Sequence, residues 1–365
     1  MDDTRIPIMR PFLPDTETLI PYLRRIDNNR WYSNYGPLCH ELEERLAEHW
    51  SVKTTHVLSL SNATQALSIA LWSVEAPAGS LCLMPSWSFV ATAHAARQVG
   101  FTPFLTDVDA NSAALTPDIA FASLKRAPSP VGAVIVVCPF GAPVPWEDWA
   151  DFQQRTGIPV IIDAAAAFDT VQPGPVPTVV SLHATKVFPA GEGAILMCTN
   201  DDVVEQARRR ANFGFLGDHH SRCHATNAKM SEYHAAVGLA SLDAWPANRR
   251  RWQSALNQMR QACAQAGLAD WPQGLGETYV CSSPTIRSAA ASHLISGLQS
   301  DGIEARRWWQ GGIASHEAFN QVPRLALPVT EQLAATTLAL PCWLDIDPQS
   351  ISRVAASLKR HAHPD

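Results

Sequence analysis

The sequence predicts an α/β protein built around a mainly parallel, mixed sheet flanked by helices. From about residue 40 to 245, short apolar runs alternate with helical stretches, which is typical of strand–helix units stacked side by side. Beyond residue 245 this texture changes to a basic amphipathic stretch, short strand-like pieces and a closing helix. We therefore expect an N-terminal arm and a large domain over 1–245 and a smaller α+β domain over 246–365, with a hinge at 243–248.

The individual elements follow from periodicity and length. Leu42, Leu46 and Trp50 recur every four residues and predict an amphipathic helix over 40–50. The strands are short apolar runs that end at polar or turn-forming residues. Strands are expected at 55–60, 80–85, 101–109, 132–140, 158–165, 178–184 and 193–199, and further helices at 63–74, 89–99, 145–157, 248–268 and 349–361.

Composition and charge exclude several classes of protein. The 365 residues are 46% hydrophobic and 17% charged, which is ordinary for a globular protein and excludes a fibrous or disordered chain. A net charge of −6 argues against a nucleic-acid partner held by bulk charge. No apolar stretch approaches the roughly 18 residues of a membrane span, and the first residues lack the apolar core of a signal peptide. We therefore expect no membrane partner. The eight cysteines form no CxxC pair and no metal-ligand spacing, so we expect no metal site and a protein of the reducing cytoplasm.

The basic residues are 23 arginines and only five lysines, so chemistry that needs a primary amine has few possible positions. Lys186 follows an apolar strand, among hydroxyl-bearing residues and before a Gly-Glu-Gly turn at 191–193. In such a place the amine can be desolvated enough to act as a nucleophile. The alternative is a solvated surface lysine.

Two more polar loops follow strands, where open α/β sheets bind ligands. The Ser61–Thr64 loop can cradle a phosphate with the first amides of the next helix, or it can simply cap that helix. Asp163 ends a very apolar strand and needs a cation or a row of donors, unless it caps the following turn. An amine, an acid and a phosphate cradle together fit pyridoxal 5'-phosphate (PLP), which carries an aldehyde, a basic ring nitrogen and a phosphate.

A series of motifs also resembles a known family. They are RWYSNYGPL (30–38), SNATQAL (61–67), PSWSFVATAHA (85–95), VIIDAAAA (160–167), SLHATK with GEGA (181–194), RANFGF (210–215) and TNAKMSEYHAAVGL (226–239). In this order they are similar to the motifs of the DegT/DnrJ/EryC1/StrS sugar aminotransferases, in particular the branch that aminates nucleotide-linked 4-keto-6-deoxysugars. The resemblance implies the fold-type I PLP-dependent transferase fold and spans most of the chain.

The resemblance implies roles for individual residues. Lys186 matches the lysine that binds PLP covalently and moves the proton, and Asp163 matches the acid that keeps the pyridine nitrogen protonated. Phe89 matches the aromatic residue that stacks on the pyridine ring, with Trp87 as the weaker candidate. Contacts to the phosphate are implied for Ala63, Thr64 and Ser181, and for Asn227, which the family supplies from the neighbouring subunit. A homodimer with shared active sites is therefore expected.

One position departs from the family pattern. Ala166 stands where many members have a His or Gln that bonds the 3'-oxygen of the cofactor. We expect either that His183 substitutes as the donor or that His183 only packs beside the strand. The resemblance also suggests substrate contacts from Tyr35, His183, Arg307 and His316, although Arg307 and its neighbours could equally form an ordinary surface and core.

The expected reaction is amino transfer from an amino acid, usually glutamate in this family, to a dTDP- or GDP-linked 4-keto-6-deoxyhexose. The product would be an aminodeoxysugar for surface polysaccharide, such as lipopolysaccharide O-antigen, or for an antibiotic. Alternatives are a cyclitol or 3-keto sugar as acceptor and a non-catalytic regulatory relative. Lys186 argues against the related PLP-dependent sugar dehydratases, which carry histidine there. A nicotinamide dehydrogenase is disfavoured because no GxGxxG follows a strand.

Overall fold

The centre of the molecule is a seven-stranded mixed sheet. The computed structural model describes residues 5–74, 77 and 79–362. The strands lie in the order β1-β7-β6-β5-β4-β2-β3, and β7 is antiparallel to both of its neighbours while the other pairs are parallel. The predicted mainly parallel, mixed sheet is thereby confirmed. Its strands are β1 (Val57–Leu60), β2 (Leu81–Pro85), β3 (Thr102–Thr106), β4 (Val131–Val137), β5 (Val160–Asp163), β6 (Thr178–Ser181) and β7 (Ala194–Met197).

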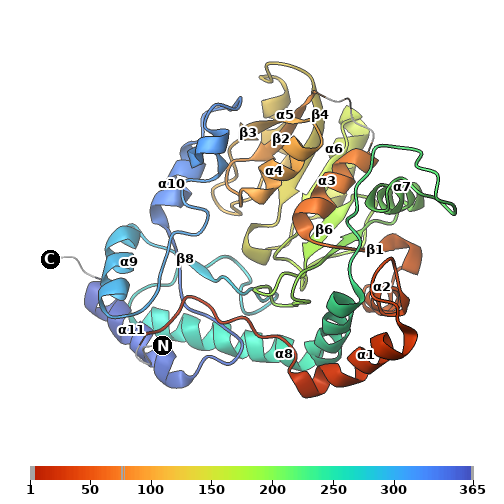
Figure 1. The fold of residues 1–365 in the computed structure, drawn as a ribbon. Coiled ribbons are helices and arrows are strands. Elements are labelled where there is room, and N and C mark those ends of the chain that lie inside the picture. Colours follow the sequence, from red (N-terminus) through yellow and green to blue (C-terminus); the bar gives the residue numbers. More distant parts are fainter. Residues whose placement is uncertain (1–4, 75–76, 78, 363–365) are drawn as a thin grey trace.

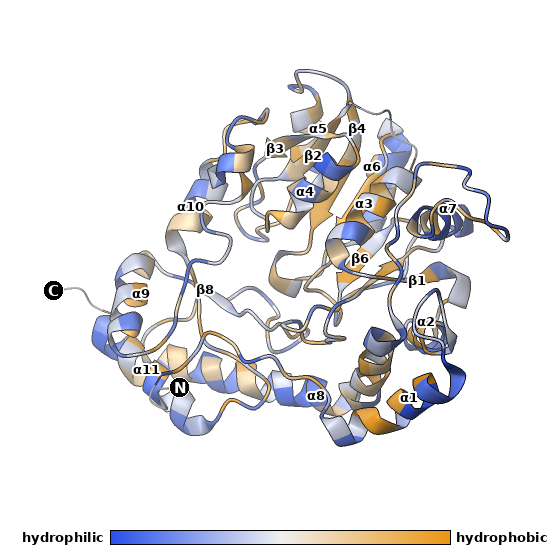
Figure 2. Ribbon diagram, viewed as in Figure 1, coloured by the Kyte–Doolittle hydropathy of each residue, from blue (hydrophilic) through white to orange (hydrophobic). Residues whose placement is uncertain are grey.

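Helices cover both faces of this sheet (Figure 1). Successive side chains of a strand point to opposite faces, so Ile161 packs in one core and Ile162 in the other. One core lies under α3 (Ala63–Ser73), α4 (Ala91–Gln98) and α7 (Asp201–Ala211), and the other includes α2 (Pro37–His49), α5 (Pro117–Leu124) and α6 (Trp146–Thr156). Figure 2 shows the apolar strands between the amphipathic helices. Because both faces are buried, the strands are near-continuous apolar runs.

Several expected strands are shorter than their apolar runs. The run 178–184 is a strand only to Ser181, and the run 132–140 ends as a strand at Val137. The residues that follow leave the sheet and form loops at its edge. Helices not expected from the sequence are α1 (Thr16–Asn29), α5, α7, α9 (Ala291–Ser300) and α10 (Pro328–Thr336).

A single long helix, α8 (Glu232–Gln265), runs through the expected hinge at 243–248 and contains Pro246. In Figure 1 it runs along the bottom of the molecule, from α1 towards α11 (Pro348–His361). The change in sequence texture at residue 245 therefore coincides with no break in secondary structure. The division at 245 stays a prediction.

Hydrogen bonds also join the two sides of the division at residue 245 at two places. At the N-terminus, Ile6 donates its N–H to Gly302 O at 3.0 Å, so the arm lies on the C-terminal part of the chain. At a second place, Leu105 in the edge strand β3 donates its N–H to Pro323 O at 3.0 Å. The C-terminal part has its own two-stranded sheet of β8 (Thr285–Arg287) and β9 (Thr337–Ala339). None of the helices in the described part of the chain has the length and apolarity that crossing a bilayer requires.

Candidate active site

The polar loops predicted from the sequence meet at one edge of the sheet. β1, β2, β5 and β6 all run in the same direction, because β1 and β6 are both antiparallel to β7 and the remaining pairs are parallel. Their carboxyl ends carry Ser61, Ser86, Asp163 and Ser181. Such an edge is where open α/β sheets bind ligands. The fold thus brings the predicted lysine, acid and phosphate loops to the same side of the sheet.

Asp163 is a buried acid at the end of β5, with 6% of its surface exposed. Oδ2 accepts a hydrogen bond from Thr92 Oγ1 at 2.8 Å, and Oδ1 accepts one from the N–H of Ala165 at 3.2 Å. Burial raises the pKa of Asp163, while the two hydrogen bonds and the Lys186 amine lower it. A carboxylate in this setting gains from a cationic N–H partner, which a protonated pyridine nitrogen provides.

Lys186 is half-buried in the loop after β6. Its backbone N–H donates to His183 O at 2.9 Å, which closes a turn around the residue. Burial lowers the pKa of the Lys186 amine, and the negative charge of Asp163 opposes this shift. Desolvation favours the neutral amine, which is the nucleophilic form.

The loop after β1 leads into the first turn of α3. Asn62 caps the helix by accepting the N–H of Gln65 at 3.0 Å, so the capping role falls to this residue. Ala63 and Thr64 occupy the first two helical positions, whose N–H groups have no acceptor inside the helix. Their amides can therefore bind an anion such as a phosphate.

Asn227 lies beside the same loop within one protomer. Its neighbour Ala228 accepts the N–H of Ser61 at 2.7 Å, and Lys229 forms a β-bridge with Leu60. The Asn227 side chain is exposed, as a residue that reaches another subunit would be. Its origin from the neighbouring subunit stays a prediction.

His183 faces a carboxylate that the sequence analysis did not single out as a functional residue. His183 Nδ1 lies 2.6 Å from Glu192 Oε1, and both side chains are half exposed. The His183 N–H donates to the hydroxyl of Ser181 at 3.3 Å. One ring nitrogen of His183 is therefore occupied, and only Nε2 could serve the donor role considered for it. The sequence held one signal for this pair, because Glu192 lies in the Gly-Glu-Gly turn nine residues after His183.

Phe89 and Trp87 differ sharply in exposure. Phe89 is 61% exposed, whereas Trp87 is 1% exposed. Trp87 packs against Phe140 and Trp309, with ring centroids 6.4 Å and 5.4 Å away. A ring that is free to stack on a cofactor is therefore the Phe89 ring.

The three other candidate substrate residues are not gathered around Lys186 by any contact in the described structure. The ring of Tyr35 lies 5.1 Å from the Arg208 guanidinium. Arg307 donates to Ala334 O and to the Ser292 hydroxyl, so it joins α9 to α10. The loop that carries His316 docks on the large sheet through the N–H of Ile313, which donates to Ser86 O at 2.7 Å.

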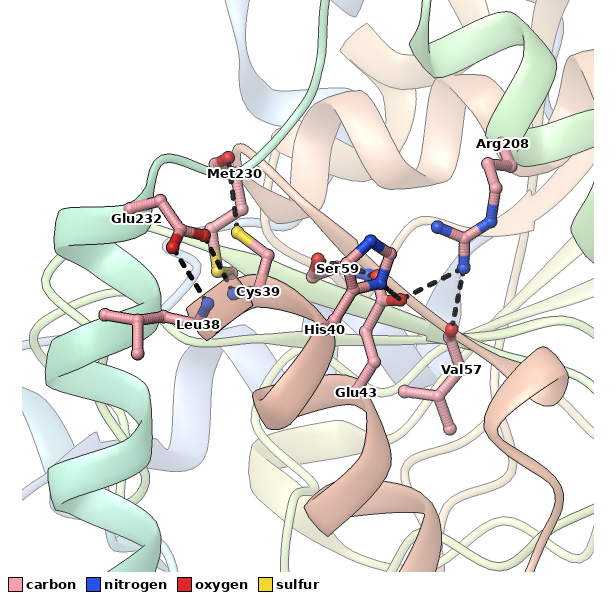
Figure 3. A network of polar contacts seen from close by, with 9 residues as sticks. All are labelled: Leu38, Cys39, His40, Glu43, Val57, Ser59, Arg208, Met230 and Glu232. Carbon is pink, nitrogen blue, oxygen red and sulfur yellow. Dashed lines mark hydrogen bonds and ion pairs between the residues drawn. The ribbon is translucent and has the colours of Figure 1, made fainter. Parts of the chain in front are cut away.

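Two buried carboxylates on and beside α2 support the loops of the site (Figure 3). Glu43 Oε1 accepts the N–H and the hydroxyl of Ser59, each at 2.8 Å, and Glu43 Oε2 pairs with Arg208 at 3.1 Å. Glu232 accepts the N–H groups of Leu38 and Cys39 at the start of α2. They hold β1 and the 226–230 segment, which meet at Ser61. A signal for Glu43 existed, because it shares the apolar face of the predicted helix with Leu42 and Leu46.

The residues present fit PLP: a desolvated amine, a buried acid and an anion-binding helix start lie at one sheet edge. This sheet order, with the acid at the end of β5 and the lysine in the loop after β6, is that of a fold-type I PLP-dependent enzyme. The chain belongs to the DegT/DnrJ/EryC1/StrS aminotransferase family, whose sequence model matches residues 14–359. The protein is therefore an aminotransferase that uses PLP, as the motifs predicted.

The similarity to known proteins extends along nearly the whole chain. Protein Rv3402c of Mycobacterium tuberculosis is 30% identical, over 97% of this chain and 90% of its own length. The dTDP-4-amino-4,6-dideoxy-D-glucose transaminase of Shigella dysenteriae is 28% identical, over 96% of this chain and 98% of its own. The crystal structure of DesI in the presence of its TDP-sugar product is 30% identical, matches 98% of this chain and 93% of its own, and gives a TM-score of 0.85.

Proposed function

We propose that this aminotransferase moves an amino group from L-glutamate to a nucleotide-linked 4-keto-6-deoxyhexose, with dTDP or GDP as the nucleotide. The observation that carries the proposal is that the buried Asp163 carboxylate ends β5 and that Lys186 lies in the loop after the adjacent parallel strand β6, at the same edge of the sheet. The acceptor class is supported by the names of the similar proteins, a dTDP-amino-sugar transaminase and an enzyme crystallised with a TDP-sugar product. The product would be an aminodeoxysugar for a surface polysaccharide, such as O-antigen, or for an antibiotic.

Each residue has a defined task in this proposal. Bound PLP supplies an aldehyde that takes up the amino group and a ring that withdraws electrons. Lys186 binds the cofactor covalently and carries the proton, and Asp163 holds the proton on the pyridine nitrogen. Phe89 stacks on the ring. Ala63, Thr64 and Ser181 bind the phosphate, and Tyr35, His183, Arg307 and His316 are the candidate contacts to the substrate.

The chemistry can be tested on the purified protein. We expect visible absorbance that borohydride removes, and Lys186→Ala protein should lack the borohydride-reducible link. L-glutamate should discharge that absorbance in a half-reaction with the wild-type protein. A colourless protein that does not bind PLP would overturn the role of Lys186. A panel of nucleotide-linked 4-keto and 3-keto sugars and cyclitols then identifies the acceptor.

We also propose a homodimer in which Asn227 of the partner subunit completes the phosphate site. Exposed aromatic side chains at Trp31, Tyr32 and Tyr233 support an interface, and the rings of Tyr32 and Tyr233 stack with centroids 6.3 Å apart. Mixing Lys186→Ala with Asn227→Ala subunits tests the sharing. A shared site regains activity in mixed dimers, because one of its two sites receives both native residues, whereas a site built within one chain regains none. Free cysteines throughout the described chain support a cytoplasmic location.

A further inference from the structure

An ion pair joins the loop after β5 to helix α8. Asp169, six residues beyond Asp163, has a side chain that is only 6% exposed. Its Oδ1 accepts a hydrogen bond from Arg249 Nε at 2.6 Å, and its Oδ2 accepts the backbone N–H of Val280 at 3.1 Å. Both oxygens of a large-domain carboxylate are thus used by partners from the C-terminal part of the chain.

Arg249 strengthens this connection by binding the same segment a second time. Its Nη2 donates to Thr278 O at 3.2 Å, while Nε serves Asp169. The planar guanidinium is suited to hold two acceptors at fixed positions. Residues 278–280 are therefore bound both by the Arg249 side chain and by the Asp169 carboxylate.

Cys281, the residue that follows 278–280, packs against the turn at Gly141. Cys281 is buried, and a Cβ added to Gly141 would lie 3.6 Å from Cys281 Cβ and 2.7 Å from Ala166 O. Gly141 itself accepts the hydroxyl of Thr170 through its carbonyl oxygen, at 3.0 Å. The 278–281 segment thus packs on the turn at Gly141, next to the 163–170 loop.

Electrostatic effects link the Cys281 thiol and the Lys186 amine. Burial raises the pKa of Cys281 to about 12, and the nearby lysine charge opposes that shift. Burial lowers the pKa of Lys186, and Cys281 opposes this shift, as Asp163 does. Cys281 thus packs on the turn that contacts Ala166, three residues after Asp163, at the sheet edge where Lys186 follows the neighbouring strand β6.

We propose that Asp169 and Arg249 form a clamp between the loop after β5 and α8 that holds the 278–281 segment as a water-excluding wall beside the site of Lys186. Both are positioning residues, since neither reaches the lysine itself. The pair resists opening because a buried carboxylate that loses its partner is left uncompensated. The inference rests on the role proposed for Lys186.

The test compares Asp169→Asn, Arg249→Met and the double variant with a matched control. Arg260→Met is that control, because Arg260 lies on the same helix and binds the residues just before the segment, at Glu277 Oε1 (2.8 Å) and Leu275 O (2.9 Å). Arg260 does not reach the 163–170 loop. A difference between the two arginine variants therefore reports the link across to Asp169, not the general loss of an arginine from α8.

The first readout is alkylation of Cys281 by N-ethylmaleimide, followed by peptide mass spectrometry, with the buried Cys263 of α8 as the internal reference. We expect about tenfold faster labelling of Cys281 in both clamp variants, with Cys263 unchanged, because the opening is local. The double variant should label at least as fast as either single variant, because each residue also binds the segment directly, Asp169 through the Val280 N–H and Arg249 through Thr278 O.

The second readout is the pH titration of the visible absorbance of the PLP-loaded protein. Water that enters beside the lysine stabilises the protonated form, so the midpoint should rise by about half a pH unit or more in the clamp variants. A role in stability alone would lower the melting temperature without moving this midpoint. Arg260→Met should leave both the labelling and the midpoint at wild-type values.

The proposal is overturned if folded clamp variants label Cys281 and titrate like the wild type, or if Arg260→Met has the same effects. Should Arg249→Met not fold, which rapid labelling of Cys263 would reveal, Arg249→Lys keeps the charge and one bond but not the second. It should give the same changes in smaller size, and wild-type values would again refute the clamp. If wild-type protein carries no reducible link at Lys186, the proposed function fails, while the labelling of Cys281 still decides whether the clamp exists.

Discussion

The hydroxyl of Thr92 donates to Oδ2 of Asp163 at 2.8 Å and lies 2.7 Å from the hydroxyl of Ser88. A chain of hydroxyl groups therefore joins the loop that carries Phe89 to the acid at the end of β5. Helix α4 was expected from the sequence, but nothing in the sequence showed that its second residue turns inward to this carboxylate.

Thr92→Val tests this contact. Without the hydroxyl donor, burial should raise the pKa of Asp163 further, and the carboxylate should hold a protonated pyridine nitrogen less well. We expect PLP affinity to fall about tenfold, measured by absorbance titration with the cofactor. Thr92→Ser keeps the donor and should bind PLP like the wild type. Equal affinity in the Val variant would show that the bond has no bearing on the cofactor.

Phe89 and Trp87 should respond in opposite ways to removal of the ring. Phe89→Ala removes an exposed ring, so we expect an unchanged melting temperature and a PLP affinity about tenfold lower. Trp87→Ala opens a cavity in the cluster with Phe140 and Trp309, and should cost about 3–5 kcal/mol of stability. Thermal unfolding and PLP titration of both variants separate the two roles. A Phe89→Ala protein with wild-type affinity would transfer the stacking role to another residue.

Glu43→Ala should be among the most destabilising changes on α2. It removes the acceptor for both Ser59 donors and leaves Arg208 without its buried partner, which together cost about 3–5 kcal/mol. Glu44→Ala, at the next and exposed position, should stay within about 0.5 kcal/mol of the wild type. Chemical unfolding followed by far-UV circular dichroism measures both. Similar losses for the two variants would contradict the structure in this region.

Asp301 should make the packing of α11 depend on pH. Ser357 donates to Oδ2 of Asp301, and with Arg360 and His361 it lowers the pKa of the carboxyl group. Since the pKa is lower in the folded state, the ionised group stabilises the fold above the unfolded pKa of about 4, and this contribution is lost as the pH falls further.

Asp301→Asn should therefore be less stable than the wild type at pH 7, and the difference should shrink below about pH 4. Melting temperatures across this range provide the measurement. The exposed Asp345→Asn serves as the control for loss of a surface carboxylate and should melt close to the wild type at pH 7. A difference that stayed constant with pH would rule out ionisation of Asp301 as its cause.

The sequence allowed the sheet and the core of the site to be predicted because both depend on local patterns. Apolar runs marked the strands, and the polar residues directly after them, such as Asp163 and Ser181, had to lie at one sheet edge. The partners of the supporting residues could not be found in this way. Glu43 meets Arg208 across 165 residues of sequence, and Asp169 meets Arg249 across 80. Such pairs exist only once the tertiary structure has formed.

The helices show a similar limit. The change in composition at residue 245 suggested a break, yet α8 continues through Pro246, because the residues on both sides find apolar partners along its length. The short helix α5 was not predicted, since its eight residues show little apolar periodicity. Thr116 and Pro117 are nevertheless typical residues for the N-cap and first position of a helix.

The proline inside the unbroken α8 has a geometric consequence for the far end of the helix. About 30 Å of helix extends beyond Pro246, the position at which a proline most readily allows a helix to bend. A bend of about 5° at Pro246 would displace the far end of α8, and α11 packed on it, by about 2–3 Å. A small change of angle at Pro246 would therefore be felt most strongly where α11 packs on α8, far from the sheet edge.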